Sequence, residues 1–335
     1  MKIIVLSLLV LICCGFTVKQ SLFIVPKKWP KPVYDFSQNE LSENKIELGK
    51  QLFYDPILSA DNKISCASCH SPYTAFTHID HALSHGIHDS IGTRNSPTLF
   101  NLAWQKKFMW DGAIVNLDMQ ALAPISHPAE MGSSINLVVK KLSASAKYKQ
   151  LFFNAFQDSS ITGQQTLKAI AQFMVTLVSA NSKYDRVKNG KEKFSISEAN
   201  GYKLFKKNCN SCHTEPLFTN ENFENNGLAV DPQLNDFGRW KITHLAKDSL
   251  LFKVPSLRNI AYTAPYMHDG RFKKLSQVIN YYMMGIVQQK TLSKQLSKGV
   301  YFTSNEKIEL LSFLNTLTDK EFISNPKFLP PPIQK

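Results

Sequence analysis

The stretch Cys66-Ala67-Ser68-Cys69-His70 decides how this chain is built, and its pattern returns as Cys209-Asn210-Ser211-Cys212-His213. Two cysteines separated by two residues and followed at once by a histidine form the attachment motif for c-type haem. Each thiol adds across one vinyl group of the porphyrin, and the adjacent imidazole becomes an axial ligand of the iron. The alternative is a zinc site, which needs four ligands, and no second cysteine pair stands near either motif.

The repeat therefore predicts two covalently bound haem c groups. One is held by Cys66 and Cys69 with His70 on its iron, and the other by Cys209 and Cys212 with His213 on its iron.

The composition describes a globular chain with a sizeable core. It has 335 residues, of which 43% are hydrophobic and 19% charged, and this length suits about two domains. Four of the six cysteines belong to the haem motifs, and Cys13 and Cys14 lie near the N-terminus. No pair is left for a structural disulfide.

The formal net charge of +13 could attract an acidic electron-donor protein. The basic residues are scattered and form no nucleic-acid-binding motif, so we expect no nucleic-acid partner.

Residues 1–18 read as a signal peptide or a lipoprotein leader. Lys2 precedes an apolar run from Ile3 to Cys14, which is typical of an export signal and too short for a membrane span. Residues 11–14 resemble a lipoprotein cleavage box except for the bulky Ile12. A soluble periplasmic or exported protein and a membrane-anchored lipoprotein both stay open. Export agrees with the haem motifs, because haem is attached to c-type cytochromes outside the cytoplasm.

The rest of the chain predicts an all-α fold with two cytochrome c-like domains, each carrying one covalently bound c-type haem. Residues 19–40 read as a tether, 41–180 as a first haem domain, 181–325 as a second haem domain and 326–335 as a tail. Apolar residues at helical spacing predict helices over residues 46–53, 135–148, 164–177, 198–207 and 306–317. Gly201, Leu204 and Phe205 repeat the spacing of residues 49, 52 and 53, and residues 179–194 read as a linker.

Further motifs resemble the bacterial dihaem cytochrome c peroxidase family, including its MauG-like branch. They occur in the family's order from about residue 41 to 320: LFYDP at 52–56, RNSPT at 94–98, WDG at 110–112, HPAEM at 127–131, VPSLRN at 254–259 and APYMHDGRF at 264–272. The resemblance implies that hydrogen peroxide is reduced to water at the first haem. Electrons from a small cytochrome c or a cupredoxin would enter through the second haem.

The resemblance also assigns roles to single residues. Glu130 matches the distal carboxylate that handles protons, because a carboxyl group in an apolar pocket can exchange a proton near neutral pH. Trp110 matches the tryptophan between the two haems. His85 resembles a distal ligand of the first iron that must swing away before peroxide binds. The alternatives are the nearby His78, His81 and His88, or an iron already open to peroxide.

The second haem leaves two distal ligands open. Counting from the APYMHDGRF motif reaches Tyr282, the residue type that MauG-like members use, and a slip of one residue reaches Met283. A thioether ligand raises the haem potential. The resemblance further implies one calcium ion at Asn95, Thr263 and Pro265, whose oxygen atoms suit that metal, and it allows a homodimer.

Two other functions compete with the peroxidase. A MauG-like oxidase would act on a protein or small-molecule substrate, and Tyr282 favours it. A plain electron-transfer cytochrome would keep both irons six-coordinate and would have no use for Glu130. The sequence sets neither the electron donor nor the haem potentials.

Overall fold

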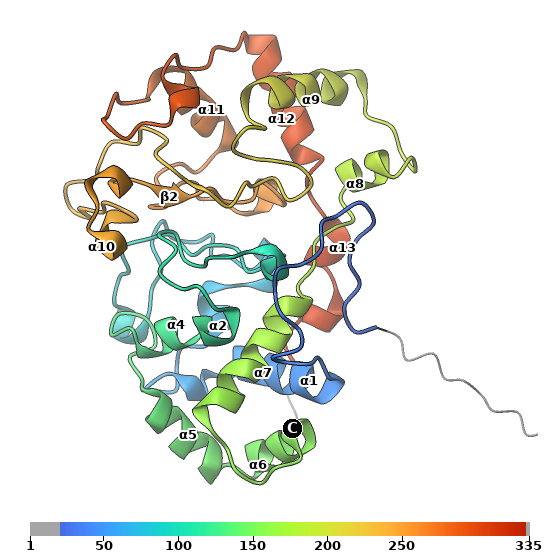
Figure 1. Cartoon of the computed structure of the whole chain (residues 1–335), viewed down its shortest axis with the longest axis vertical. Helices are drawn as coiled ribbons and strands as arrows, with labels where there is room; N and C mark the ends of the chain where they lie inside the picture. Colours follow the sequence, from blue (N-terminus) through green and yellow to red (C-terminus); the bar gives the residue numbers. More distant parts are fainter. Residues whose placement is uncertain (1–20, 333–335) are drawn as a thin grey trace, which may run out of the picture.

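The computed structural model describes residues 21–332, in which helices and loops dominate (Figure 1). The helices are α1 (Glu43–Tyr54), α2 (Cys66–Cys69), α3 (Leu117–Gln120), α4 (Leu122–Ser126), α5 (Ile135–Ala144), α6 (Ala146–Phe156), α7 (Gly163–Thr176), α8 (Lys183–Lys188), α9 (Ile196–Asn208), α10 (Trp240–Thr243), α11 (Leu275–Met284), α12 (Ser304–Asn315) and α13 (Lys320–Ile323). Two strands, β1 (Phe223–Glu224) and β2 (Phe252–Lys253), pair antiparallel. The leader, residues 1–18, lies outside the described residues.

The helices form two lobes, which Figure 1 shows one above the other. The N-terminal lobe contains α1–α7, where α1 packs against α6 and α7, and the C-terminal lobe contains α8–α12, where α9 packs against α12. Each lobe has its own cluster of buried apolar side chains. The helix-rich class is therefore confirmed, whereas the domain limits at residues 180 and 181 stay a prediction.

A glycine lies at the main helix contact of each lobe. A Cβ atom added to Gly49 of α1 would lie 1.9 Å from the carbonyl oxygen of Ala169 in α7. A Cβ atom added to Gly201 of α9 would lie 1.9 Å from the carbonyl oxygen of Glu309 in α12. The repeated spacing seen in the sequence thus corresponds to the same close helix contact in both lobes.

One predicted helix is two helices in the structure. The apolar pattern over residues 135–148 predicts one helix, but α5 ends and α6 begins at Ser145. The backbone of Ser145 is extended, and its hydroxyl accepts a hydrogen bond from the amide of Tyr148 at 3.4 Å. Serine is a good N-cap, so a new helix starts there.

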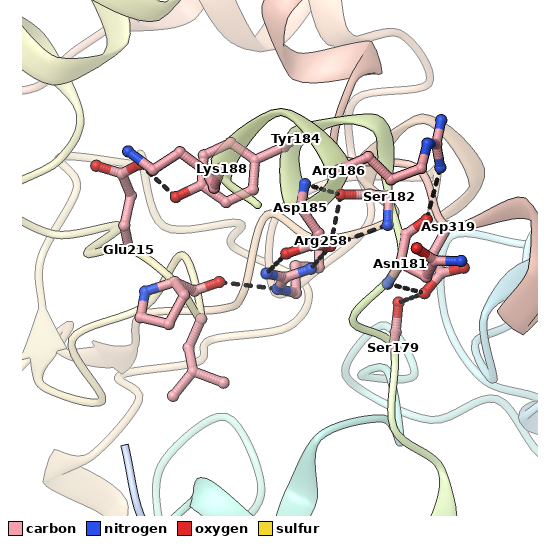
Figure 2. A network of polar contacts seen from close by, with 12 residues as sticks. Ser179, Asn181, Ser182, Tyr184, Asp185, Arg186, Lys188, Glu215, Arg258 and Asp319 are labelled. Carbon is pink, nitrogen blue, oxygen red and sulfur yellow. Dashed lines mark hydrogen bonds and ion pairs between the residues drawn. The ribbon is translucent and has the colours of Figure 1, made fainter. Parts of the chain in front are cut away.

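The polar segment 179–194 is ordered rather than a loose linker. It contains α8, and its Asp185 receives two hydrogen bonds from the guanidinium group of Arg258, at 2.8 and 2.7 Å (Figure 2). Asp319 accepts hydrogen bonds from Ser179 and from the amide of Asn181. These partners lie more than 70 residues away in the chain, so the local sequence could not predict them.

Residues at both ends of the described chain pack on the lobes, although a tether and a tail were predicted. Trp29 lies edge-on to Trp104 with ring centroids 4.9 Å apart, and the Arg258 guanidinium lies 4.5 Å from the Trp29 ring. At the other end, Phe328 packs on Phe322, which belongs to the core of the N-terminal lobe. Aromatic side chains thus turn proline-rich segments into packed ones. Among the helices of residues 21–332, none has the length and hydropathy that a membrane crossing needs.

Candidate functional site

The first haem motif forms a single helical turn, α2, capped by Ser65. Cys66 and Cys69 are half-buried and carry free thiols. Desolvation raises the pKa of Cys66 to about 12 and that of Cys69 to about 11. The Nδ1 atom of His70 donates a hydrogen bond of 2.9 Å to the carbonyl oxygen of Phe76, which leaves Nε2 as the nitrogen that can bind iron.

The second motif repeats this arrangement. Nδ1 of His213 lies 3.2 Å from the carbonyl oxygen of Phe218 and 3.1 Å from that of Pro255. Desolvation lowers the pKa of both motif histidines to about 4, so each imidazole is neutral, as an iron ligand must be. Two free thiols one turn apart beside an oriented imidazole fit a covalently attached haem at each motif.

A loop with four histidines, at positions 78, 81, 85 and 88, lies beside the first motif. The Cys69 thiol donates a 3.5 Å hydrogen bond to the carbonyl oxygen of His85. Nδ1 of His85 lies 2.8 Å from the Asp89 carboxylate. The ring centroids of His81 and His85 are 4.3 Å apart. Nε2 of His78 lies 3.1 Å from Nδ1 of His81. The backbone of His85 therefore lies next to the first motif, and its role as a distal ligand stays a prediction.

Glu130 lies against this same loop. Its carbonyl oxygen accepts a 2.7 Å hydrogen bond from the amide of Ile87, and a Cβ atom on Gly86 would come within 2.5 Å of its Cα atom. Burial raises the pKa of the Glu130 carboxyl, although His127, with Nδ1 at 3.9 Å, opposes the rise. The Glu130 charge also contributes to the raised pKa of Cys69. A carboxyl group that can hold or release a proton thus lies at the first motif.

A cavity of about 290 Å³ adjoins the second motif. Cys209, Cys212 and His213 line it from the C-terminal lobe, and Trp110 and Asn95 line it from the N-terminal lobe. Its other walls are mainly apolar, which suits a porphyrin face. Both lobes thus contribute to one cofactor-sized space.

The two candidate distal ligands of the second haem both lie on α11, but their surroundings differ. Tyr282 lines the cavity, and desolvation raises its pKa to about 12. Met283 packs against the core of the C-terminal lobe, and Met284 is 81% exposed. Met267 also lines the cavity, and its sulfur lies 3.4 Å from the Asn226 amide nitrogen. Met267 was not among the predicted distal ligands, because its motif served only as the point from which Tyr282 was counted.

Three contacts of Trp110 and its neighbour Asp111 fix the position of Trp110. Its indole Nε1–H donates a 2.8 Å hydrogen bond to the carbonyl oxygen of Asn95, and its own carbonyl oxygen accepts one of 2.7 Å from the amide of Lys253. The carboxylate of the next residue, Asp111, pairs with Arg94 at 2.6 Å. These contacts fix both the ring and the backbone of Trp110.

An ion-pair network behind Trp110 joins the lobes. Arg94 also donates two hydrogen bonds to the buried carboxylate of Asp236, at 2.6 and 2.9 Å. Arg94, with help from Lys241, lowers the pKa of Asp236 to about 2. No pattern in the sequence points to Asp236, because it lies in an irregular segment between motifs.

The three predicted calcium residues all lie beside the second motif. Asn95, Thr263 and Pro265 all line the cavity beside the second motif. The Asn95 side-chain amide donates a 3.0 Å hydrogen bond to the carbonyl oxygen of Ala82, and its backbone amide donates one of 2.7 Å to that of His268. All three residues thus lie at one cavity, and a calcium ion held by them stays a prediction.

The comparisons with known proteins agree with this geometry. Residues 43–193 match the family model described as di-haem cytochrome c peroxidase. The chain is 36% identical over 304 residues to the methylamine utilization protein MauG of Methylorubrum extorquens, covering 87% of this chain and 82% of the relative. It is 34% identical over 290 residues to cytochrome c551 peroxidase of Nitrosomonas europaea, covering 85% and 83%.

Solved structures agree as well. A MauG-like protein associated with microbial copper homeostasis superposes with a TM-score of 0.83 at 32% identity, covering 92% of this chain and 98% of that chain. The diheme peroxidase BthA from Burkholderia thailandensis shares the fold, with a TM-score of 0.73 at 20% identity over 85% and 88% of the two chains. The chain belongs to the di-haem cytochrome c peroxidase family.

Proposed function

We propose that this chain is an oxidoreductase that reduces hydrogen peroxide to two waters, using two protons and two electrons from a small redox protein. The observation that carries the proposal is that Glu130 lies against Gly86 and Ile87, the residues that follow His85, and that its charge acts on Cys69 of the first haem motif. Several relatives at 31–35% identity are named cytochrome c peroxidases, which supports the same activity.

In this proposal the two haems are held by the two motifs, with His70 and His213 as their axial ligands. The haem irons would supply the electron chemistry of peroxide cleavage. The raised pKa of the Glu130 carboxyl suits a group that takes a proton from one peroxide oxygen and gives it to the other. The apolar surroundings of the motif would keep competing water out.

His85 would control access to the first iron. Its loop carries no helix longer than one turn between residues 75 and 101, so the loop can change conformation without breaking a core element. With His85 bound, peroxide would have no open position, and with His85 displaced, Glu130 would face the substrate.

Trp110 would carry electrons between the lobes, because it lines the cavity of the second motif and belongs to the N-terminal lobe. Tyr282, or alternatively Met283, would be the distal ligand there. One calcium ion at Asn95, Thr263 and Pro265 would tie the two lobes together. Export to the periplasm, a lipid anchor, a homodimer and a cytochrome c or cupredoxin donor remain predictions of the sequence.

A rapid-mixing experiment tests the proposal. The full-length holoprotein, in fully ferric and half-reduced forms, is mixed with hydrogen peroxide beside Glu130→Gln and the control Glu43→Gln, an exposed carboxylate of α1. We expect fast reaction in the parent and the control and slow reaction in Glu130→Gln. Reaction of the half-reduced form alone would support gating by His85. Failure of both forms to react would leave an electron-transfer cytochrome instead.

A MauG-like oxidase is the second candidate, and the position of Tyr282 favours it. Tyr282 lines the cavity, whereas Met283 packs into the core of the lobe. Tyrosine oxygen stabilises ferric iron more than a thioether does. The ferric absorption spectrum of Tyr282→Phe should therefore differ from that of the parent, while an unchanged spectrum would remove the support for this candidate.

A further inference from the structure

The cavity beside the second haem motif has an unusual charge distribution. Of the residues within 21–332 that line it, Lys253 is the one lysine or arginine and Glu224 is the one carboxylate. Glu224 accepts a hydrogen bond from the Ser293 hydroxyl. A lysine ammonium group in a mainly apolar wall is costly unless a negative group neutralises it.

Lys253 has only a weak partner for its charge within the described protein. Its Nζ atom donates a 3.1 Å hydrogen bond to the side-chain oxygen of Gln105, which is uncharged, and lies 3.8 Å from the Glu221 carboxylate. Burial raises the pKa of Glu221, and its Oε2 atom is buried without a hydrogen-bond partner among residues 21–332. A carboxyl group whose ionised form is disfavoured compensates a cation poorly.

We propose that the Lys253 ammonium group is the charge partner of a propionate of the haem attached at Cys209 and Cys212. A haem carries two propionate carboxylates into the site, and a carboxylate that leaves water needs a cation or hydrogen-bond donors. Lys253 is the one lysine or arginine that the described wall offers, and the Gln105 amide lies beside it. Burial lowers the pKa of the Lys253 ammonium group, so a neighbouring carboxylate would favour its charged form. The proposal rests on the haem site assigned under the proposed function.

The backbone fixes where this lysine stands. Lys253 lies on β2, paired with Phe223 of β1. Its amide donates a 2.7 Å hydrogen bond to the carbonyl oxygen of Trp110. Lys253, which would hold the haem edge, is thus hydrogen-bonded to Trp110, which would carry electrons toward the haem. A haem propionate paired with Lys253 would therefore be held by a residue whose backbone is hydrogen-bonded to Trp110.

The test uses the reduction potentials of the two haems in full-length holoprotein, together with the haem content per chain. Lys253→Met removes the charge and keeps the length of the side chain, Lys253→Arg keeps the charge, and Glu224→Gln removes the opposite charge from the same cavity. Lys247→Met is the control, because Lys247 is an exposed lysine outside the cavity wall.

Reduction adds an electron, so a nearby cation raises the potential and a nearby carboxylate lowers it. We expect Lys253→Met to lower the reduction potential of one haem and Glu224→Gln to raise the potential of the same haem. Lys253→Arg and Lys247→Met should leave that potential unchanged. If Lys253→Met does not accumulate, Lys253→Gln takes its place.

Fully loaded Lys253→Met with unchanged potentials would overturn the proposal. A shift of both haems by equal amounts, or an equal shift in Lys247→Met, would also overturn it, since it would indicate a general field effect. These potentials do not depend on peroxide turnover. Loss of the peroxidase hypothesis and loss of this one are therefore distinguishable.

Discussion

The indole Nε1–H of Trp110 donates a 2.8 Å hydrogen bond to the backbone carbonyl oxygen of Asn95. Both residues line the cavity beside the second haem motif, and Asn95 follows Arg94, which pairs with Asp111 next to the tryptophan. The ring is thus fixed by the same short segment that joins the lobes. A fixed ring orientation matters for electron transfer, because the coupling between redox groups depends on distance and orientation.

Trp110→Phe should keep both haems and slow electron transfer between them. Phenylalanine keeps an aromatic ring but loses the indole and its hydrogen bond, which costs about 1 kcal/mol of unfolding free energy. The matched control is Trp104→Phe, because Trp104 donates an equivalent 2.8 Å bond to the carbonyl oxygen of Pro30 outside the cavity wall. We expect similar stability losses in both variants but slower transfer, measured by rapid mixing, only in Trp110→Phe. Equal transfer rates would contradict an electron-carrying role.

Glu130 should give the peroxide reaction a pH dependence. Burial raises the pKa of its carboxyl above the ordinary 4.5, and only the ionised form can accept a proton from peroxide. The rate of the peroxide reaction should therefore fall as the pH is lowered through a midpoint above 4.5. Glu130→Gln should remove this limb and lower the rate by about 10²–10⁴-fold.

His127 provides the control for that profile. Its Nδ1 lies 3.9 Å from the Glu130 carboxylate and lowers the Glu130 pKa. His127→Asn should move the acid limb to higher pH while keeping the reaction fast. If the acid limb of the pH–rate profile persists in Glu130→Gln, the titrating group is a residue other than Glu130.

The sequence predicted what periodicity and motif spacing can encode. The helix around Gly49 and the helix around Gly201 are where the apolar spacing predicted them. It failed where a residue's partner is far away in the chain. Trp29 looked like part of a tether because nothing near it in sequence shows that Trp104 and Arg258 receive it.

Ion pairs of the site could not be predicted for the same reason, because their partners are far apart in the chain. Arg94 belongs to a recognised motif, but Asp236 lies 142 residues later in a segment without periodicity. Whether Tyr282 or Met283 faces the cavity depends on the rotation of α11, and a register argument with a one-residue uncertainty cannot fix a rotation of about 100° per residue.

Arg94→Leu should destabilise the protein strongly, because it leaves the carboxylates of Asp111 and Asp236 without their shared partner. Breaking a buried pair in this way costs about 3–5 kcal/mol. Arg186→Leu is the control, since its pair with Glu192 is far more exposed and should cost about 0–1 kcal/mol. Chemical unfolding of the holoprotein measures both, and similar losses would show that the Arg94 network is no stronger than a surface pair.

The acid stability of the same network follows from the Asp236 pKa. That pKa is about 2 in the folded protein against an ordinary 3.8, so ionised Asp236 stabilises the fold above pH 3.8 by about 2 kcal/mol. This contribution should disappear as the pH falls from about 4 to about 2. In Arg94→Leu the pKa returns toward its ordinary value, and unfolding curves collected across this range should lose that part of their pH dependence.

Gly201→Ala should loosen the contact between α9 and α12. The added methyl group would lie 1.9 Å from the carbonyl oxygen of Glu309, far inside van der Waals contact, so the helices must separate. The gain of about 1 kcal/mol from better helix propensity is smaller than the overpacking cost of about 1–3 kcal/mol. We therefore expect a net loss of unfolding free energy, whereas Lys203→Ala, at an exposed position of α9, should change it by less than about 0.5 kcal/mol. Because α9 leads directly into Cys209, Gly201→Ala should also lower the haem content at the second motif relative to the first, and full loading with unchanged stability would contradict the close contact.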